Sequence, residues 1–491
     1  MGLDETLDLH VELPRLDPVE RKERGPAKCR VTGTIDNPKI SVQNASLVLR
    51  DPKRKEAIIA AHGIDLNMQV EKTDAGRVLA VAPVQIFKKD KLSLGLADGL
   101  VKLIAPDLHS SGKVEGEISL AFKTIRIPLG VAEDLLLQRL EAEGTLTLQQ
   151  VSAEAKNPMS QTVLKLLADM HGKPASKVIR IVDDSEIHLK VRDGKLVYDG
   201  MRIGVPDIDP ALVVTSRGSV GLDETLDLRL ELPRLRAVKS QNKEPVPCRI
   251  TGTLTNPKID VEGASLVVHL AGGKKPSLTV DNLDLKFNVE STKDGRVLTL
   301  APVTIFEKRK LTPEVGDELL HLVAPTLADV TGVQGEISLS LDTFRVPLDV
   351  PKGEFAKRIE LAGKLRLHEI SADTKTPLLG SMVKVLADMH GKKPSEVVRI
   401  VENADVRFQV RDGRIYHEGL RMGLPDIDPK LLVSSSGSVG LDKSLDLVLE
   451  VPRIVSPFKK DIDDPKAPVR LRITGTFDKP VVTEIKGEKG K

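Results

Sequence analysis

The sequence repeats itself with a period of 219 residues, and this period limits the possible folds more than any other feature. Residues 2–9 (GLDETLDL) return at 221–228 and, with two changes, at 440–447 (GLDKSLDL). The same offset relates Cys29 to Cys248. Because the offset holds over a whole unit, we expect each copy to have the same order of strands, turns and helices.

The repeat divides the chain into two units and part of a third. We predict a first unit at 1–219, which starts in mid-repeat, a second at 220–438, a partial third at 439–483 and a charged tail at 484–491. After Pro452 the offset grows by four residues. Met1 stands where the other copies have Val220 and Val439, so we expect the chain to be the C-terminal part of a longer protein.

Apolar and polar residues alternate along most of each unit, which is typical of half-buried β-strands. Residues 7–13 (LDLHVEL) place Leu or Val at every second position, and their copies at 226–232 and 445–451 keep this apolar side. The same alternation predicts strands at 30–35, 64–70, 78–86, 116–122, 124–129, 144–151, 187–191 and 195–203.

Turn signals separate these strands. Asp193-Gly194, copied as Asp412-Gly413, joins two alternating segments, and Asp-Gly in this setting is the strongest short signal for a β-hairpin. Each Thr-Gly-Thr strand contains a glycine, which usually indicates a bulge or a close approach of backbone. These glycines are Gly33, Gly252 and Gly475.

Two segments in each unit have helical spacing instead. They lie at 96–108 and 160–170, with copies at 313–323 and 381–389. A glycine follows the second helix of each unit, at Gly172 and Gly391, as is common where helices end. The unit is therefore predicted to be mainly antiparallel sheet with two short helices.

Composition excludes several classes of function. The 73 basic and 71 acidic residues nearly cancel, so no global field attracts nucleic acid, and aromatic residues amount to only 2%, too few to stack bases. The two cysteines are copies of one position rather than an evident pair. We find no signal peptide and no apolar run long enough to span a membrane as a helix.

A sheet with one apolar face must bury that face. A sandwich, a closed barrel and a folded groove that meets a ligand all achieve this. The partial third copy favours units joined edge to edge into a continuous sheet. We therefore expect an elongated repeat of twisted antiparallel sheet, for which a groove similar to a β-taco is one of these three arrangements.

The order of elements near the C-terminus resembles a known family. A strand with an Asp-Gly hairpin at 408–415, strands at 419–422, 437–441 and 445–447, and an Ile-Thr-Gly-Thr strand ending in Lys479-Pro480 resemble the C-terminal region of AsmA-like proteins. The same series runs through 187–257. The resemblance, which extends to TamB and to bridge-like lipid carriers, implies a periplasmic β-groove that conducts phospholipid between membranes during outer membrane biogenesis.

In such a groove the chemistry is solvation of acyl chains. Shielding a sixteen-carbon chain from water is worth roughly 12 kcal/mol, at about 0.8 kcal/mol per methylene. Replacing Leu228 and Leu230 with Asp is then expected to abolish lipid binding and to leave the sheet folded. The predicted groove lining comprises Leu7, Leu9, Val11, Leu13, Ile118, Leu120, Phe122, Ile187, Leu189, Val191, Leu226, Leu228, Leu230, Leu232, Leu285, Phe287, Val289, Ile337, Leu339, Phe408, Val410, Leu445, Leu447 and Leu449.

Three repeated motifs invite other interpretations. Asp-Met-His-Gly at 169–172 and 388–391 supplies too few ligands for a good metal site, and its His is better placed to interact with a helix end. The two carboxylates of Pro-Asp-Ile-Asp-Pro at 206–210 and 425–429 could bind calcium or act as an acid–base pair, but the motif favours a rigid turn. Basic runs at 88–91 and 307–310 could meet phosphate head groups, although a sheet edge protected by Lys explains them more simply.

No nucleophile elbow, phosphate loop or paired-Glu arrangement is present, so we expect a non-enzymatic protein without a cofactor. Its expected partners are phospholipid or another acyl-chain lipid, membrane surfaces and envelope proteins, and not nucleic acid. The alternative is a repeat scaffold or interaction protein with sealed β-sandwich units and no lipid ligand.

Overall fold

The computed structural model describes most of the chain, which divides into two compact units. Unit 1 comprises 1–237 with 241–259, and unit 2 comprises 238–240 with 260–491. The described residues are 6–13, 26–50, 57–74, 76–92, 114–154, 178–182, 185–233, 244–268, 278–293, 295–311, 334–350, 354–373, 377–394, 397–400, 404–424, 426–440, 442–452, 468–476 and 479–485.

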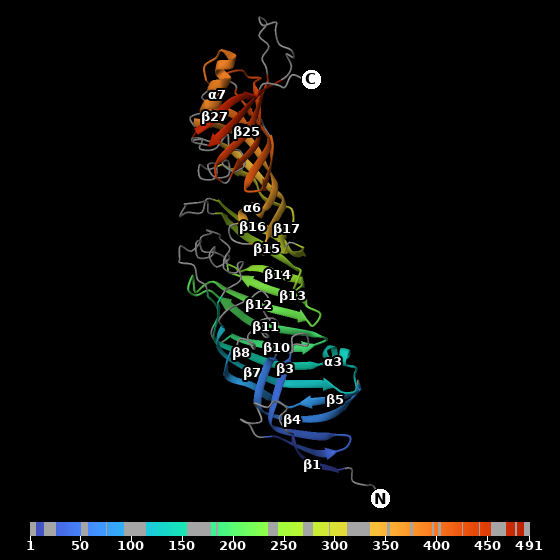
Figure 1. The fold of residues 1–491 in the computed structure, drawn as a ribbon. Helices are drawn as coiled ribbons and strands as arrows, with labels where there is room; N and C mark the ends of the chain where they lie inside the picture. Colours follow the sequence, from blue (N-terminus) through green and yellow to red (C-terminus); the bar gives the residue numbers. More distant parts are fainter. Residues whose placement is uncertain are drawn as a thin grey trace. The chain divides into compact units, whose positions relative to one another are not determined.

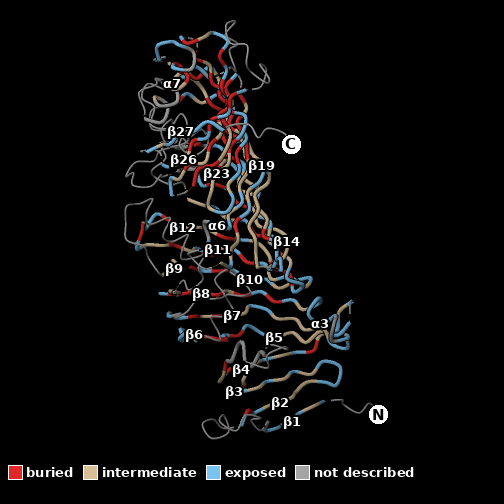
Figure 2. The backbone as a smooth tube through the Cα atoms, turned by 45° about the horizontal axis from the view of Figure 1, so that its top comes forward, coloured by how far each residue is buried: buried red, intermediate tan, exposed pale blue. Residues whose placement is uncertain are grey.

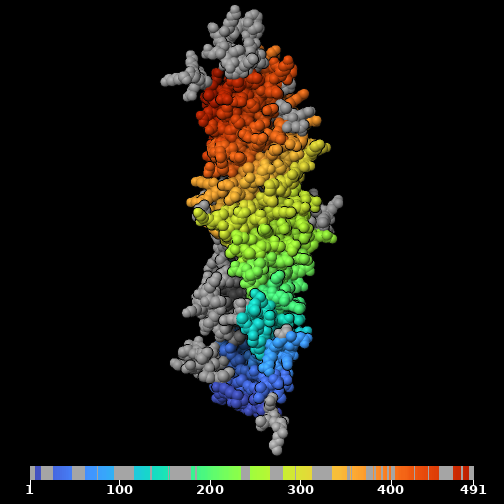
Figure 3. Space-filling model, turned by 90° about the vertical axis from the view of Figure 1, so that its right-hand side faces the viewer, coloured from blue at the N-terminus to red at the C-terminus, as the bar shows by residue number. Residues whose placement is uncertain are grey.

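The described part of unit 1 is built almost entirely of strands, which follow one another in sequence order from blue to green (Figure 1). The surface shows the same order of colours (Figure 3). They are β1 (Thr6–Leu13), β2 (Ala27–Thr34), β3 (Pro38–Arg50), β4 (Ala57–Thr73), β5 (Gly76–Val81), β6 (Val84–Lys91), β7 (Val114–Pro128), β8 (Glu141–Glu154), β9 (Val178–Ile181), β10 (Ser185–Arg192), β11 (Lys195–Gly204), β12 (Val213–Gly221), β13 (Thr225–Leu232) and β14 (Val246–Thr253). The division between the units falls within β15 (Pro257–Val268).

Unit 2 repeats this order of strands. They are β16 (Leu278–Thr292), β17 (Gly295–Leu300), β18 (Val303–Lys310), β19 (Gln334–Pro347), β20 (Glu360–Asp373), β21 (Val397–Ile400), β22 (Ala404–Arg411), β23 (Arg414–Gly423), β24 (Leu432–Gly440), β25 (Ser444–Val451), β26 (Val469–Thr476) and β27 (Lys479–Ile485). The first strand of the repeat thus begins at Thr6, Thr225 and Ser444. The predicted unit boundaries themselves stay a prediction.

The strands pair as an antiparallel meander. In unit 1, β1 to β4 pair successively, and β11 to β14 do the same. Between them, β5 and β6 lie end to end along β7, and β9 and β10 share β8 and β11 in the same way. The prediction of a mainly β, antiparallel fold is confirmed.

Two predicted strand boundaries are wrong. The single strand expected at 78–86 is two strands, because Pro83 has no N–H for the sheet ladder and separates β5 from β6. Conversely, the two strands expected at 116–122 and 124–129 are one strand, β7, whose pairing with β8 is irregular between Phe122 and Thr124. A bulge allows one long strand to change its alternation without ending.

The predicted Asp-Gly hairpins are confirmed. Asp193 and Gly194 have φ values of 52° and 68°, and Arg192 pairs with Lys195 directly across the turn. Positive φ at both central residues is the geometry of a type I′ turn, which matches the twist of the flanking strands. The hairpin at Asp412-Gly413 has nearly the same angles.

The glycine of the Thr-Gly-Thr strands is explained by close contact between backbones. Gly252 has φ of 90°, and a Cβ there would lie 2.6 Å from the carbonyl oxygen of Asn256 in the following turn. A Cβ at Gly33 or Gly475 would meet the corresponding carbonyl at a similarly short distance. The predicted close approach is confirmed, and a larger residue would displace this hairpin.

Of the predicted helices, the one at 381–389 is confirmed as α7 (Pro377–His390). It ends in a Schellman arrangement, in which Gly391 N–H donates to Asp388 and Lys392 N–H donates to Ala387. The predicted helices at 96–108, 160–170 and 313–323 lie outside the described residues. Two further helices were not predicted, α3 (Glu133–Arg139) and α6 (Phe355–Arg358), which occupy the same place in the two units.

Candidate lipid-binding face

In unit 1 the strand registers place apolar residues in a continuous row on one side of the sheet, which we call the apolar face. The row starts at Leu9 on β1, which pairs with Val31 on β2, and each member lies opposite the next. Paired residues point to the same side of a sheet, so the row does not change sides. It continues through Ile40, Met68, Val81, Ile125, Ala142, Val191, Leu196, Val220 and Leu226.

Unit 2 has the same kind of row. Val289 pairs with Leu298, which pairs with Val346 on β19. Two residues away on β19, and therefore on the same side, Phe344 continues the row. From there it runs through Leu361, Val410, Ile415, Val439 and Leu445.

The predicted lining residues differ widely in exposure. Of these, only Leu9 and Val11 are exposed, and the side chain of Leu13 lies outside the described residues. Half-buried residues are Leu7, Phe122, Val191, Leu230, Leu232, Leu285, Phe287 and Val410. The buried residues are Ile118, Leu120, Ile187, Leu189, Leu226, Leu228, Val289, Ile337, Leu339, Phe408, Leu445, Leu447 and Leu449.

The three copies of one strand show this difference most clearly. Leu9 on β1 is 56% exposed, whereas its copies Leu228 on β13 and Leu447 on β25 are 6% and 0% exposed. At the next apolar position, Val11 is 37% exposed and Leu449 is 0% exposed. The same alternating sequence therefore forms an accessible apolar surface at β1 and a closed core at β25.

In unit 2 the closed core lies near α7. Figure 2 shows buried residues concentrated among the strands of this part, and α7 lies against β27. Val383, Leu386 and Ala387 of α7 are buried, and their i, i+3, i+4 spacing places them on one side of the helix. This end of unit 2 therefore has the packing of a finished hydrophobic core.

The opposite face of the sheet carries charge pairs that recur in all three copies. Arg30 Nε donates to Asp8 at 3.2 Å, Arg249 to Asp227 at 3.1 Å and Arg472 to Asp446 at 2.9 Å. The hydrogen bond from the arginine holds the pKa of Asp446 below its usual value. These exposed pairs are worth little individually but define this side of the sheet as the polar face.

One buried polar pair interrupts the apolar face at the same place in each unit. In unit 1 the hydroxyl of Tyr198 lies 2.8 Å from Ser216 Oγ, and in unit 2 His417 Nε2 lies 3.1 Å from Ser435 Oγ. All four residues are buried. Burial lowers the pKa of His417 from 6.5 to about 4, so the ring is neutral near pH 7. Its Nδ1 atom has no hydrogen-bond partner.

The sequence interpretation missed this pair. A signal was present, because Tyr198 and Ser216 stand at positions where the alternation requires apolar residues. The repeat strengthens that signal, since His417 and Ser435 follow them at the same offset. The alternation alone could not show that the side chains of Tyr198 and Ser216 lie within hydrogen-bonding distance across β11 and β12.

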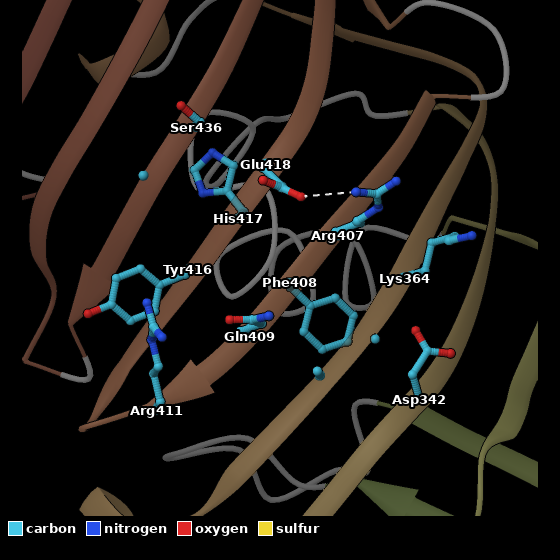
Figure 4. A pocket seen from close by; sticks show the side chains of 13 residues that line it. Asp342, Lys364, Arg407, Phe408, Gln409, Arg411, Tyr416, His417, Glu418 and Ser436 are labelled. Atoms are coloured by element: carbon cyan, nitrogen blue, oxygen red, sulfur yellow. Dashed lines mark hydrogen bonds and ion pairs between the residues drawn. The ribbon is translucent and has the colours of Figure 1, made fainter.

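A basin of about 540 Å³ lies in unit 2 over strands β19, β20, β22, β23 and β24 (Figure 4). Arg407 Nη1 lies 3.3 Å from Glu418, and the Arg411 guanidinium carbon lies 4.6 Å from the ring centroid of Tyr416. The remaining charged side chains are Lys364 and Asp342, so three cationic and two anionic side chains line the basin. This mixture of charges selects no particular ligand.

The Pro-Asp-Ile-Asp-Pro motif forms a turn in unit 1. The carboxylate of Asp209 accepts a hydrogen bond from the N–H of Ala211, and Ile208 packs with Leu212 in a small buried cluster. Asp207 lies 3.3 Å from Arg180. This geometry supports the rigid-turn interpretation over the calcium interpretation.

The described residues also include one Asp-Met-His-Gly copy, the basic run of unit 1 and both cysteines. The Asp-Met-His-Gly copy at 388–391 ends α7, and the copy at 169–172 is outside the described part. In the basic run of unit 1, Lys88, Lys89 and Lys91 are exposed on β6. Cys29 is half-buried opposite Val11, and Cys248 is buried opposite Leu230.

Within the described ranges, no group of three or more His, Cys, Asp or Glu residues is arranged to hold a metal ion. The helices seen there also lack the length and apolar character needed to span a bilayer. In the comparisons with known proteins, no family model, curated protein or solved structure matches this chain.

Proposed function

We propose that the apolar face of unit 1 binds the acyl chains of phospholipid, and that the chain is an AsmA-like, non-enzymatic protein of the cell envelope that carries lipid between membranes. The observation that supports this most strongly is the continuous apolar row whose first strand exposes Leu9 and Val11. Contiguous exposed apolar surface on a soluble protein is typical of a binding site.

The dimensions of the face agree with this proposal. Twelve strand positions, with the end-to-end pairs β5/β6 and β9/β10 counted once each, extend over roughly 50 Å at about 4.8 Å per strand. An acyl chain reaches about 15 Å, half of a hydrocarbon core. The face of unit 1 is therefore longer than one acyl chain, although its members Val81, Ala142, Val220 and Leu226 are buried. Its aliphatic residues make dispersion contacts that have no preferred direction. Such contacts would allow an acyl chain to move along the face.

A second function is favoured at the other end of the chain. The complete burial of Leu447 and Leu449 beside the α7 end of unit 2 is typical of a structural core, not of a ligand-binding surface. We therefore assign lipid binding to the part of the apolar face of unit 1 that is exposed on β1 and half-buried on β2 to β4. We assign a closing or scaffold role to the C-terminal strands of unit 2.

The proposal predicts that Leu9→Asp together with Val11→Asp weakens binding of phospholipid by about tenfold or more. Each apolar side chain that covers the acyl chain contributes about 1.5–3 kcal/mol, and a charge on the face must also be desolvated. The protein would be incubated with phosphatidylethanolamine and phosphatidylglycerol vesicles and re-isolated. The retained lipid would then be quantified by mass spectrometry over a range of vesicle concentrations.

The matched control is Thr6→Asp together with His10→Asp, which adds the same charge to the polar face of the same strand. This control is expected to retain lipid at the wild-type level. Equal retention by both double variants would contradict the proposal, as would wild-type protein that retains no lipid. Circular dichroism would verify that both variants remain folded, as expected for substitutions at exposed positions.

A further inference from the structure

Three arginines stand in a row on the polar face of unit 1. Arg217 on β12 pairs with Arg229 on β13, and Arg229 pairs with Arg249 on β14, in strands that lie side by side (Figure 1). All three residues are exposed. Residues that pair directly have Cβ atoms about 5 Å apart, so the row carries three guanidinium groups over roughly 10 Å of sheet.

The repeat shows that only one of these arginines recurs with the sheet itself. Arg249 belongs to the charge pairs with aspartate that are present in all three copies. The positions of Arg217 and Arg229 hold Ser436 and Val448 in unit 2, where β24 and β25 pair in the same register. The sheet therefore forms without arginine at these two positions.

The two additional arginines lie opposite each other without a compensating partner. Within the part of the chain that the structure describes, Arg217 and Arg229 make no ion pair and no side-chain hydrogen bond. Like charges that face each other across two strands are destabilising. An anion bound between the two guanidinium groups would remove this repulsion.

Three carboxylates lie near the row, and each already accepts a hydrogen bond from another group. Asp227 and Glu231 flank the row on β13, and Asp199 belongs to the bulge of β11 beside β12. Their donors are Arg249 for Asp227, Thr215 for Glu231 and the N–H of Gly200 for Asp199. Arg202 of β11, which pairs with Thr215, adds a fourth arginine to this part of the sheet. Positive charge is therefore in local excess.

We propose that Arg217 and Arg229 bind a phosphate group, and that the ligand is a phosphomonoester. A guanidinium group is a planar fork that donates two parallel hydrogen bonds to phosphate oxygens. A phosphomonoester carries close to two negative charges at neutral pH, which matches the two arginines, whereas a phosphodiester carries one. The phosphate belongs either to a small soluble molecule or to a lipid head group. The site lies on the face opposite the apolar face, so this inference is independent of acyl-chain binding.

Two probes test the site on the full chain. Methyl phosphate represents the soluble source and would be titrated with detection by phosphorus NMR. Vesicles of phosphatidylcholine with phosphatidic acid represent the lipid source, and their binding would be measured by co-sedimentation against vesicles of phosphatidylcholine alone. Saturable binding of methyl phosphate without preference for phosphatidic acid assigns a soluble ligand, and preference for phosphatidic acid assigns the head group. Binding of neither probe overturns the proposal.

The arginine pair would be replaced by the residues of unit 2, as Arg217→Ser with Arg229→Val. This variant is expected to bind the responding probe about tenfold or more weakly, because it lacks both charged donors. The matched control is Lys28→Ser with Lys39→Val, which removes the same charge from exposed polar-face positions that pair with no other cation. The control is expected to bind like the wild type. Wild-type affinity in the arginine variant, or an equal loss in both variants, would contradict the site.

The charge of the ligand is tested with the phosphodiester counterpart of the responding probe. This counterpart is dimethyl phosphate for methyl phosphate, and phosphatidylglycerol for phosphatidic acid in the same vesicles. The phosphodiester is expected to bind the wild-type chain several-fold more weakly, because it neutralises only one of the two arginines. Equal binding of the monoester and the diester would overturn the assignment to a phosphomonoester.

Discussion

Replacing Leu447 with Asp is expected to unfold unit 2, whereas the same substitution at Leu9 is expected to leave unit 1 folded. Leu447 is fully buried, so the variant creates a cavity and leaves a carboxylate without water or a partner. The combined cost exceeds about 5 kcal/mol, which is comparable with the whole stability of a typical domain. Leu9 is exposed, and a change there costs less than about 1 kcal/mol.

Hydrogen exchange followed by mass spectrometry would measure both effects, because it reports protection separately for peptides from each unit. Leu228→Asp provides the intermediate case. Leu228 is buried, so the sequence-based expectation that Asp at this position leaves the sheet folded is revised, and a loss of protection around β13 is expected. Equal tolerance of Asp at all three positions would contradict the assignment of a closed core to β25.

Acidification from pH 6.5 to pH 4 is expected to destabilise unit 2 through His417. In the unfolded chain this histidine takes up a proton near pH 6.5, but burial lowers its pKa in the folded unit to about 4. Between these values the unfolded state binds more protons, so stability falls as the pH falls and is fully present above pH 6.5. The free energy of unfolding of unit 2 is expected to fall by about 3 kcal/mol between pH 6.5 and pH 4.

Urea unfolding at a series of pH values, read by hydrogen exchange in unit 2, would measure this loss. The register neighbours of His417, Phe408 and Gly437, are uncharged, so its own titration dominates locally. The control is His417→Tyr with Phe408→Leu, which reproduces the Tyr198 and Leu189 pair of unit 1. This variant is expected to lack the loss between pH 6.5 and 4, and the same loss in both proteins would contradict the role of His417.

The paired carboxylates of the polar face titrate in a separate window. Hydrogen bonds from arginines lower the pKa values of Asp405 and Asp446 below the ordinary 3.8. Their stabilisation is therefore present above that value and is lost only as the pH falls further. The wild-type chain and the His417→Tyr, Phe408→Leu control both carry these carboxylates. Their titration therefore does not affect the difference in pH dependence between the two proteins.

Much of the fold could be predicted because its signals are local. Alternation, the Asp193-Gly194 turn and Gly252 each report on a few neighbouring residues and on backbone geometry that only certain residues adopt. The repeat added a second observation of each signal. The break at Pro83 was missed because an apolar pattern continues across it, although proline cannot take part in the sheet ladder.

The exposure of the candidate site could not be predicted in this way. Leu9 and Leu447 stand in almost identical sequences, and alternation states only that one side of the strand is apolar. Whether that side is accessible depends on which strands and helices pack nearby, which is a property of distant segments such as β12 and α7. The burial of His417 is non-local for the same reason.

Photo-crosslinking with a phospholipid that carries a diazirine at the middle of an acyl chain tests the central claim most directly. After irradiation, the labelled residues of the wild-type chain would be identified by peptide mass spectrometry. Acyl chains bound as proposed would label apolar-face positions of unit 1, such as Val11 and Leu230, and would leave the polar-face neighbours His10 and Arg229 unlabelled. Labelling of the polar face would contradict this claim. Labelling of the apolar face no stronger than that by a water-soluble diazirine would contradict it as well.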